Sequence, residues 1–172
     1  MDIFDEELLN FWRSLNKFGF KYIMVGGVAT NLNGYQRTTN DINVWIENTI
    51  ENRQKFRNAF KEYSSIDYFM MERMQIVPGW SGFNLNNGYR VDLLSYRVDL
   101  LIDMKGLEEL SFDECLKQPN IASIHDIDVP FLQINHLIAN KKAVNRPKDQ
   151  IDVIYLGKIK KIQEENPPSE ND

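Results

Sequence analysis

The stretch VGGVATNLNGYQRTTNDINVWI, residues 25–46, constrains the fold of this chain more than any other segment. A short apolar strand runs directly into Gly26 and Gly27, and a second strand begins at Asp41. Glycines at a strand end let the backbone approach a ligand closely. Asp41 and Asn43 share one face of their strand, where two oxygen donors can hold a hard cation such as Mg²⁺. Taken alone, each feature also fits a tight turn or hydrogen bonding at a strand start, so their combination matters most.

Composition excludes several classes of protein. The 172 residues fit one domain, and 42% hydrophobic with 26% charged residues is ordinary for a globular chain. A net charge of -5 argues against a generally basic, nucleic-acid-binding surface. The single cysteine, Cys115, rules out an internal disulfide framework. The acidic N-terminus does not resemble a signal peptide, and no apolar run is long enough for a bilayer. We therefore expect a soluble, cytoplasmic protein that does not enter a membrane.

Periodicity and breakers predict a mixture of helices and strands. Helical spacing covers 4–18, 48–63, 111–118, 133–144 and 147–165, and a short helix follows Gly27. Strands are expected at 21–25, 41–46, 127–132 and in a β-rich stretch, MQIV, SGFNL and YRVDLL, in which Asn86-Asn87-Gly88 signals a hairpin. The fold class is α/β, or α+β by stricter naming: one small mixed sheet flanked by helices. We expect a single domain over 1–162, whose C-terminal part from about 131 is helical, and a disordered tail at 163–172.

A tandem repeat of seven residues lies in the β-rich stretch. YRVDLLS at 89–95 is followed at once by YRVDLLI at 96–102. Read as one strand, an odd period puts Asp92 and Asp99 on opposite faces, so only one of them can join Asp41. The hairpin before the repeat should fix the register of Asp92, and we favour Asp92 as the acid near Asp41, with Asp99 as the alternative.

The order of these parts resembles the DNA polymerase β superfamily of nucleotidyltransferases, and most closely its small bacterial members, the minimal nucleotidyltransferases and AbiEii-toxin-like proteins. The shared pattern is an apolar strand, Gly-Gly, a short helix, Asp-x-Asp on a strand and a third carboxylate on a neighbouring strand. GYQRTTND looks like the family's Gly-x-x-Arg-x-Thr-x-Asp approach. INHLIANKKAVNRPKDQIDVIYL is similar to its closing segment. The resemblance covers residues 20–157.

This resemblance implies a nucleotidyltransferase-like fold and Mg²⁺-dependent transfer of a nucleoside monophosphate from an NTP to a hydroxyl. The residues that it implies for the metal and for catalysis are Asp41, Asn43 and Asp92, or Asp99 in place of Asp92. Those implied for the nucleotide are Gly26, Gly27, Arg37, Thr39, Lys141, Arg146 and Lys148. The last three are also consistent with a solvated helix end, and Arg37 with capping of its loop.

Asn43 departs from the family pattern, which has an acid at this position. An amide oxygen can bind Mg²⁺ but brings no charge and cannot bridge two cations, so a two-ion site would be weakened. The chain is then either an active transferase, which is our preferred hypothesis, or a catalytically weakened or inactive nucleotide- or protein-binding homologue. Its role as a toxin–antitoxin component with an antitoxin partner is a further prediction from the resemblance. The acceptor stays open among a tRNA end, a protein and a small molecule.

Overall fold

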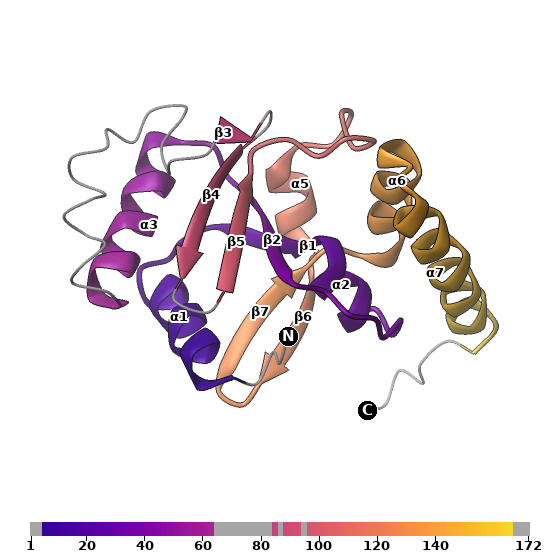
Figure 1. Cartoon of the computed structure of the whole chain (residues 1–172), viewed down its shortest axis with the longest axis horizontal. Coiled ribbons are helices and arrows are strands. Elements are labelled where there is room, and N and C mark those ends of the chain that lie inside the picture. Colours follow the sequence, from indigo (N-terminus) through magenta and orange to yellow (C-terminus); the bar gives the residue numbers. More distant parts are fainter. Residues whose placement is uncertain (1–4, 64–83, 86–87, 94–95, 167–172) are drawn as a thin grey trace.

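The computed structural model describes residues 5–63, 84–85, 88–93 and 96–166, and for strands β3 and β4 it describes the backbone only. In chain order the elements are α1 (Glu6–Lys17), β1 (Tyr22–Val25), α2 (Gly26–Leu32), β2 (Asp41–Ile46), α3 (Ile50–Tyr63), β3 (Asn84–Leu85), β4 (Gly88–Leu93), β5 (Tyr96–Leu101), α5 (Phe112–Lys117), β6 (Asn120–Ile124), β7 (Ile127–Phe131), α6 (Ile134–Val144) and α7 (Pro147–Glu165). Figure 1 shows α1 and α3 at one end of the molecule and α6 with α7 at the other.

The strands form one mixed sheet in the order β3-β4-β5-β2-β1-β7-β6. β1 pairs antiparallel with β2 and parallel with β7, and β2 pairs parallel with β5. Among the strands whose side chains the structure describes, β1 is the best buried, since all four of its residues are buried. A strand covered on both faces is expected to be continuously apolar, as YIMV is. The predicted fold class, a mixed sheet flanked by helices, is confirmed.

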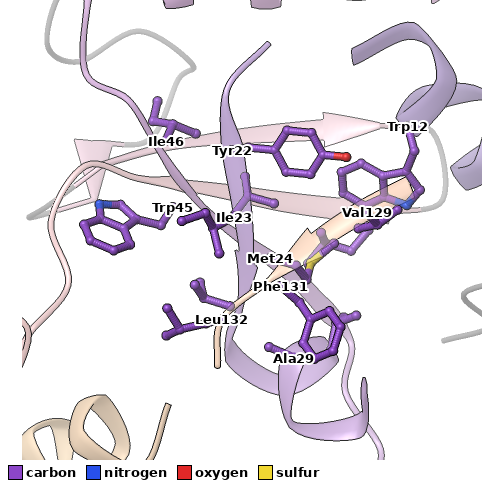
Figure 2. Close-up of a cluster of buried hydrophobic side chains, with 14 of the residues drawn as sticks. Trp12, Tyr22, Ile23, Met24, Ala29, Trp45, Ile46, Val129, Phe131 and Leu132 are labelled. Carbon is purple, nitrogen blue, oxygen red and sulfur yellow. The ribbon is translucent and has the colours of Figure 1, made fainter. Parts of the chain in front are cut away.

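Aromatic side chains cover one face of β1. Trp12 of α1 stacks on Tyr22 with ring centroids 5.5 Å apart. On the opposite face Trp45 of β2 meets Phe112 of α5 edge to face at 5.4 Å. Figure 2 shows Trp12 and Tyr22 to one side of β1 and Trp45 to the other. Because helices cover both faces, the strand ends are where the sheet opens toward solvent.

The two copies of the seven-residue repeat form two antiparallel strands, β4 and β5, rather than one long strand. Arg90 lies opposite Asp99, and Asp92 lies opposite Arg97. The expectation that the odd period places the two acids on opposite faces of one strand was therefore wrong. The arginine of each copy is thus the register partner of the aspartate of the other copy.

Other expectations about element boundaries held, with local differences. The hairpin at 86–88 is confirmed by the antiparallel pairing of Leu85 with Gly88. The prediction omitted β6, which pairs with β7 at the far edge of the sheet. α7 continues to Glu165, into the segment expected to be a disordered tail, while 167–172 and the predicted strand MQIV lie outside the described residues. Within the part of the chain that the structure describes, no helix is both long and apolar enough to span a bilayer.

Candidate functional site

The turn from β1 into α2 is held by two glycines that have no space for a side chain. Gly26 has a positive φ of 65°, and a Cβ there would lie 3.0 Å from the Cβ of Asn43. A Cβ on Gly27 would lie 2.4 Å from the Oγ1 of Thr39 and 3.3 Å from an Nη2 atom of Arg37. The glycines therefore let β2 and the loop before it pack directly against this turn. α2 begins at Gly26 itself, earlier than the sequence indicated.

Three polar residues lie close together on the paired strands β2 and β5: Asp41, Asn43 and Asp99. Asn43 is the register partner of Asp99, and Asp41 that of Arg97. Asp41, Asn43 and Asp99 all line one cleft. Asp99 is 7% exposed, whereas the Asp41 side chain is 42% exposed. The parallel pairing of β2 with β5, which the sequence did not reveal, creates this cluster.

The structure corrects the choice between the two repeated acids. Asp99 lies on β5, next to β2, and reaches the cleft. Asp92 lies on β4, which is separated from β2 by β5. We had expected Asp92 beside Asp41 because the hairpin fixes its register. That register does hold, but it places Asp92 on the more distant strand.

A second cluster of charges joins the loop after α2 to the C-terminal helices. Asp152 forms ion pairs with Arg37 and Lys141. The Nε of Arg37 lies 2.8 Å from its Oδ1, and the Nζ of Lys141 lies 2.8 Å from its Oδ2. The Nε of Arg146 lies 2.6 Å from the Oδ2 of Asp149 in another ion pair. The Oδ1 of Asp149 lies 3.4 Å from the Nζ of Lys141. The side chains of Asp149, Asp152 and Lys141 are at most 3% exposed. Three of the predicted phosphate-binding cations are thus already paired with carboxylates.

The electrostatics of Asp149 follow from these contacts. Burial by itself raises the pKa of its carboxyl, but hydrogen bonds from Arg146 and the charges of Lys141 and Arg146 outweigh burial, and the pKa falls below its ordinary value. The hydrogen bond from Arg146 to Asp149 correspondingly raises the pKa of the guanidinium. Asp149 also accepts a hydrogen bond from the backbone N–H of Arg146, and so caps the start of α7.

The two clusters border a single cleft of about 450 Å³. It is lined by every predicted site residue whose side chain the structure describes: Gly26, Gly27, Arg37, Thr39, Asp41, Asn43, Lys141, Arg146, Lys148 and the alternative Asp99. Asp103 and Lys105, which the sequence analysis missed, line it as well. Both residues follow the end of β5. Their position directly after the RVDLL strand is the sequence signal that could have identified them as cleft residues. The Nδ2 of Asn140 donates to the backbone oxygen of Lys105 at 2.9 Å and ties this loop to α6.

Asp41, Asn43 and Asp99 on β2 and β5 are the residues that could hold the magnesium ion expected from the sequence. Asp41, Asn43 and Asp99 offer carboxylate and amide oxygens, which Mg²⁺ prefers. Among the described residues no group of three or more His, Cys, Asp or Glu side chains is placed to hold a metal, consistent with an amide at Asn43. Two carboxylates balance the charge of one divalent cation, and the site has no acid at position 43 to bridge a second.

No protein-family model matches this chain, and no curated protein matches its sequence. A solved structure does resemble it: ANT(2")-Ia in complex with adenylyl-2"-tobramycin, with a TM-score of 0.53 over 92% of this chain and 93% of that one, at 14% identity. At this identity the likeness concerns the fold. It supports the nucleotidyltransferase-like architecture expected from the sequence, and does not reach the AbiEii-like subtype.

Proposed function

We propose that this protein is a nucleotidyltransferase that transfers a nucleoside monophosphate from an NTP to a hydroxyl group. The observation that carries the proposal is the convergence of Asp41, Asn43 and Asp99 on one polar cleft, beside the Gly26-Gly27 turn. A cleft of about 450 Å³ is within the usual size range of small-molecule sites. The nucleotidyltransferase-like fold, recognised in a structure that holds an adenylylated aminoglycoside, agrees with this assignment.

In this proposal Asp41, Asn43 and Asp99 hold one Mg²⁺. When bound, this ion neutralises charge on the phosphates and favours the attacking oxygen as a nucleophile. The turn at Gly26 and Gly27 lines the cleft, and in this proposal it forms the wall beside the triphosphate. In the transfer, the hydroxyl oxygen of the acceptor forms a bond to the α-phosphorus and loses its proton to solvent, the bond from the α-phosphorus to the bridging oxygen breaks, and pyrophosphate leaves.

In this proposal the phosphates are bound by cationic side chains whose hydrogen-bond donors are exposed. Lys105 and Lys148 line the cleft, and neither has an ion pair among the contacts of the described residues. Arg146 is 55% exposed despite its bond to Asp149, so it keeps donors for a phosphate oxygen. Lys141, at 3% exposure between two carboxylates, contributes its charge rather than a direct contact.

We propose a small molecule bearing a hydroxyl as the acceptor. The complex of the structural neighbour contains a nucleotidylated small molecule, adenylyl-2"-tobramycin. The net charge of -5 gives less support to a tRNA acceptor, which the sequence analysis left open with a protein acceptor. The proposed acceptor is therefore an alcohol small enough to share the cleft with the sugar and α-phosphate of the nucleotide.

A turnover assay tests the proposal. The protein is incubated with each NTP, Mg²⁺ and a panel of polyhydroxylated small molecules, and pyrophosphate release and the mass of the acceptor are measured. We expect pyrophosphate release and an acceptor heavier by one nucleoside monophosphate, both lost in the Asp41→Asn variant. Nucleotide binding without turnover would instead support the second candidate, a nucleotide-binding homologue without catalysis. Asn43, in place of an acid, is the observation that favours that alternative.

The predicted toxin–antitoxin role with an antitoxin partner is a finer proposal that rests on the resemblance to AbiEii-like proteins. A growth assay tests it: expression of the parent chain should slow a bacterial host, and the Asp41→Asn variant should not. Equal growth of hosts expressing the parent and the variant at matched protein levels would argue against a toxic activity.

A further inference from the structure

The charge cluster at the start of α7 contains more than the phosphate-binding groups that the sequence indicated. Asp152 is 1% exposed and holds two cations from distant parts of the chain. Lys141 comes from α6, and Arg37 comes from the loop between α2 and β2. A buried carboxylate between two cations is well compensated, whereas loss of that carboxylate leaves two positive charges facing each other.

Arg37 is fixed at both its backbone and its side chain. Its N–H donates to the Oδ1 of Asn31 at 3.0 Å, and the Nδ2 of Asn31 donates to its carbonyl oxygen at 2.9 Å. Its guanidinium binds Asp152 through Nε at 2.8 Å and through Nη2 at 3.0 Å. The Nη2 contact is a hydrogen bond and the Nε contact is a close ion pair, so two contacts to one carboxylate restrict the orientation of the guanidinium.

The guanidinium of Arg37 also forms part of the wall beside the glycine turn. Its Nη2 atom lies 3.3 Å from the place where a Cβ of Gly27 would be. Thr39, two residues further along the same loop, packs against Gly27 more tightly still. The position of this loop therefore sets the shape of the cleft next to Gly27.

We propose that Asp152 is a positioning residue of the candidate site, and that Arg37 acts through it rather than by binding phosphate. Asp152 anchors the loop of Arg37 and Thr39 to α6 and α7, and so holds the cleft wall at Gly27 in place. The proposal rests on the proposed function for the identity of the ligand. In this proposal Arg37 does not bind phosphate, as the sequence suggested, but forms an ion pair with Asp152 that holds its loop against α7.

A double-mutant cycle separates these two roles of Arg37. ATP with Mg²⁺ is titrated into the full chain and into the Arg37→Gln, Asp152→Asn and doubly substituted variants. If Arg37 acts through Asp152, Arg37→Gln weakens ATP binding about tenfold in the parent. In the Asp152→Asn background, where Lys141 has also lost its ion pair, Arg37→Gln should weaken binding no further, because the interaction that it removes is already gone. Losses that multiply in the double variant, or unchanged binding in Asp152→Asn, would overturn the proposal.

Arg13→Gln provides a matched control. Arg13 binds Asp126 at 3.1 Å in an ion pair between distant segments, outside the cleft. Its substitution removes an arginine–aspartate ion pair that is more exposed than that of Arg37 and Asp152, and should leave ATP affinity as in the parent. Arg37→Gln leaves the bond between Lys141 and Asp152 intact, so it keeps the cycle informative should Asp152→Asn fold poorly.

Amide hydrogen exchange over residues 35–40 gives a readout that does not depend on any ligand. We expect faster exchange in Arg37→Gln and Asp152→Asn, but not in Arg13→Gln. Absence of saturable ATP binding by the parent would count against the proposed function, while faster exchange in the variants would still support the anchoring role. Exchange in both cleft variants equal to that of the parent would overturn that role.

Discussion

Asn43 of β2 lies directly opposite Asp99 of β5, and on its other side opposite Val25, the last residue of β1 before the glycine turn. Val25, Asn43 and Asp99 therefore lie side by side on three neighbouring strands, next to the glycine turn. The arrangement explains how an acid far along the sequence reaches the Gly-Gly segment. It also places a neutral side chain at the centre of the proposed cation site.

Restoring an acid at that centre should strengthen the site. Asn43→Asp adds a third carboxylate, and we expect Mg²⁺ affinity to rise about tenfold, equivalent to about 1.4 kcal/mol. Without Mg²⁺ the added charge repels Asp41 and Asp99, so the variant should unfold more easily until Mg²⁺ is supplied. Magnesium titration and thermal unfolding with and without the ion measure both effects. Asn40→Asp, an equal charge change on the exposed loop, is the control, and Mg²⁺ affinity unchanged by Asn43→Asp would remove residue 43 from the site.

The two repeated aspartates should differ in their effect on metal binding. Asp99→Asn removes one of the two carboxylates that line the cleft beside Asn43, and we expect loss of measurable Mg²⁺ binding. Asp92→Asn changes the equivalent residue of the other copy, on β4, and should leave Mg²⁺ binding intact. Isothermal titration of both variants makes the comparison. Equal losses in the two variants would contradict the placement of Asp99 as the metal ligand.

The close packing at Gly27 predicts an unequal response to alanine. A Cβ there meets Thr39 at 2.4 Å, so Gly27→Ala forces the loop away and should cost about 1–3 kcal/mol of unfolding free energy. A Cβ on Gly157, within α7, meets no atom within 4 Å. Gly157→Ala should therefore stabilise the protein by about 0.5–1 kcal/mol, because glycine weakens a helix interior. Chemical denaturation of both variants checks the contrast, and a stable Gly27→Ala protein with normal cleft binding would refute it.

The lowered pKa of Asp149 predicts how stability depends on pH. A carboxyl whose pKa is lower in the folded than in the unfolded state stabilises the fold above its unfolded pKa of about 4 and loses that contribution as pH falls through the folded pKa. Asp149→Asn should be less stable than the parent at neutral pH, with a gap that narrows in acid. Denaturation at several pH values measures this gap. A gap that stays constant from neutral to acidic pH would show that Asp149 does not supply it.

Much of the fold was predictable because local signals agree with the final structure. The apolar run at β1, the alternation of β2 and Pro147 at the start of α7 each specify one element. Gly26, Gly27, Asp41 and Lys148, which the sequence singled out, line one cleft. Such residues can be predicted because a short motif determines which residues stand at the end of a strand.

What failed depended on pairing between distant segments. The repeat has the same composition in both copies, so nothing local distinguishes one strand from a hairpin. The place of β5 beside β2, which selects Asp99 over Asp92, is a property of the sheet order. Nothing in the sequence singled out Asp149 and Asp152, because only the tertiary packing of α6 against α7 brings Lys141 to them.

The most direct test of the account is a calorimetric titration of each NTP into the parent chain with Mg²⁺, with EDTA in place of Mg²⁺, and into Asp41→Asn and Asp99→Asn with Mg²⁺. The account predicts saturable binding of at least one NTP to the parent, in a one-to-one ratio, that is lost with EDTA and in both variants. No binding of any NTP to the folded parent, or binding that is the same in all four arrangements, would contradict the claim that this cleft holds a nucleotide through its carboxylates and a metal ion.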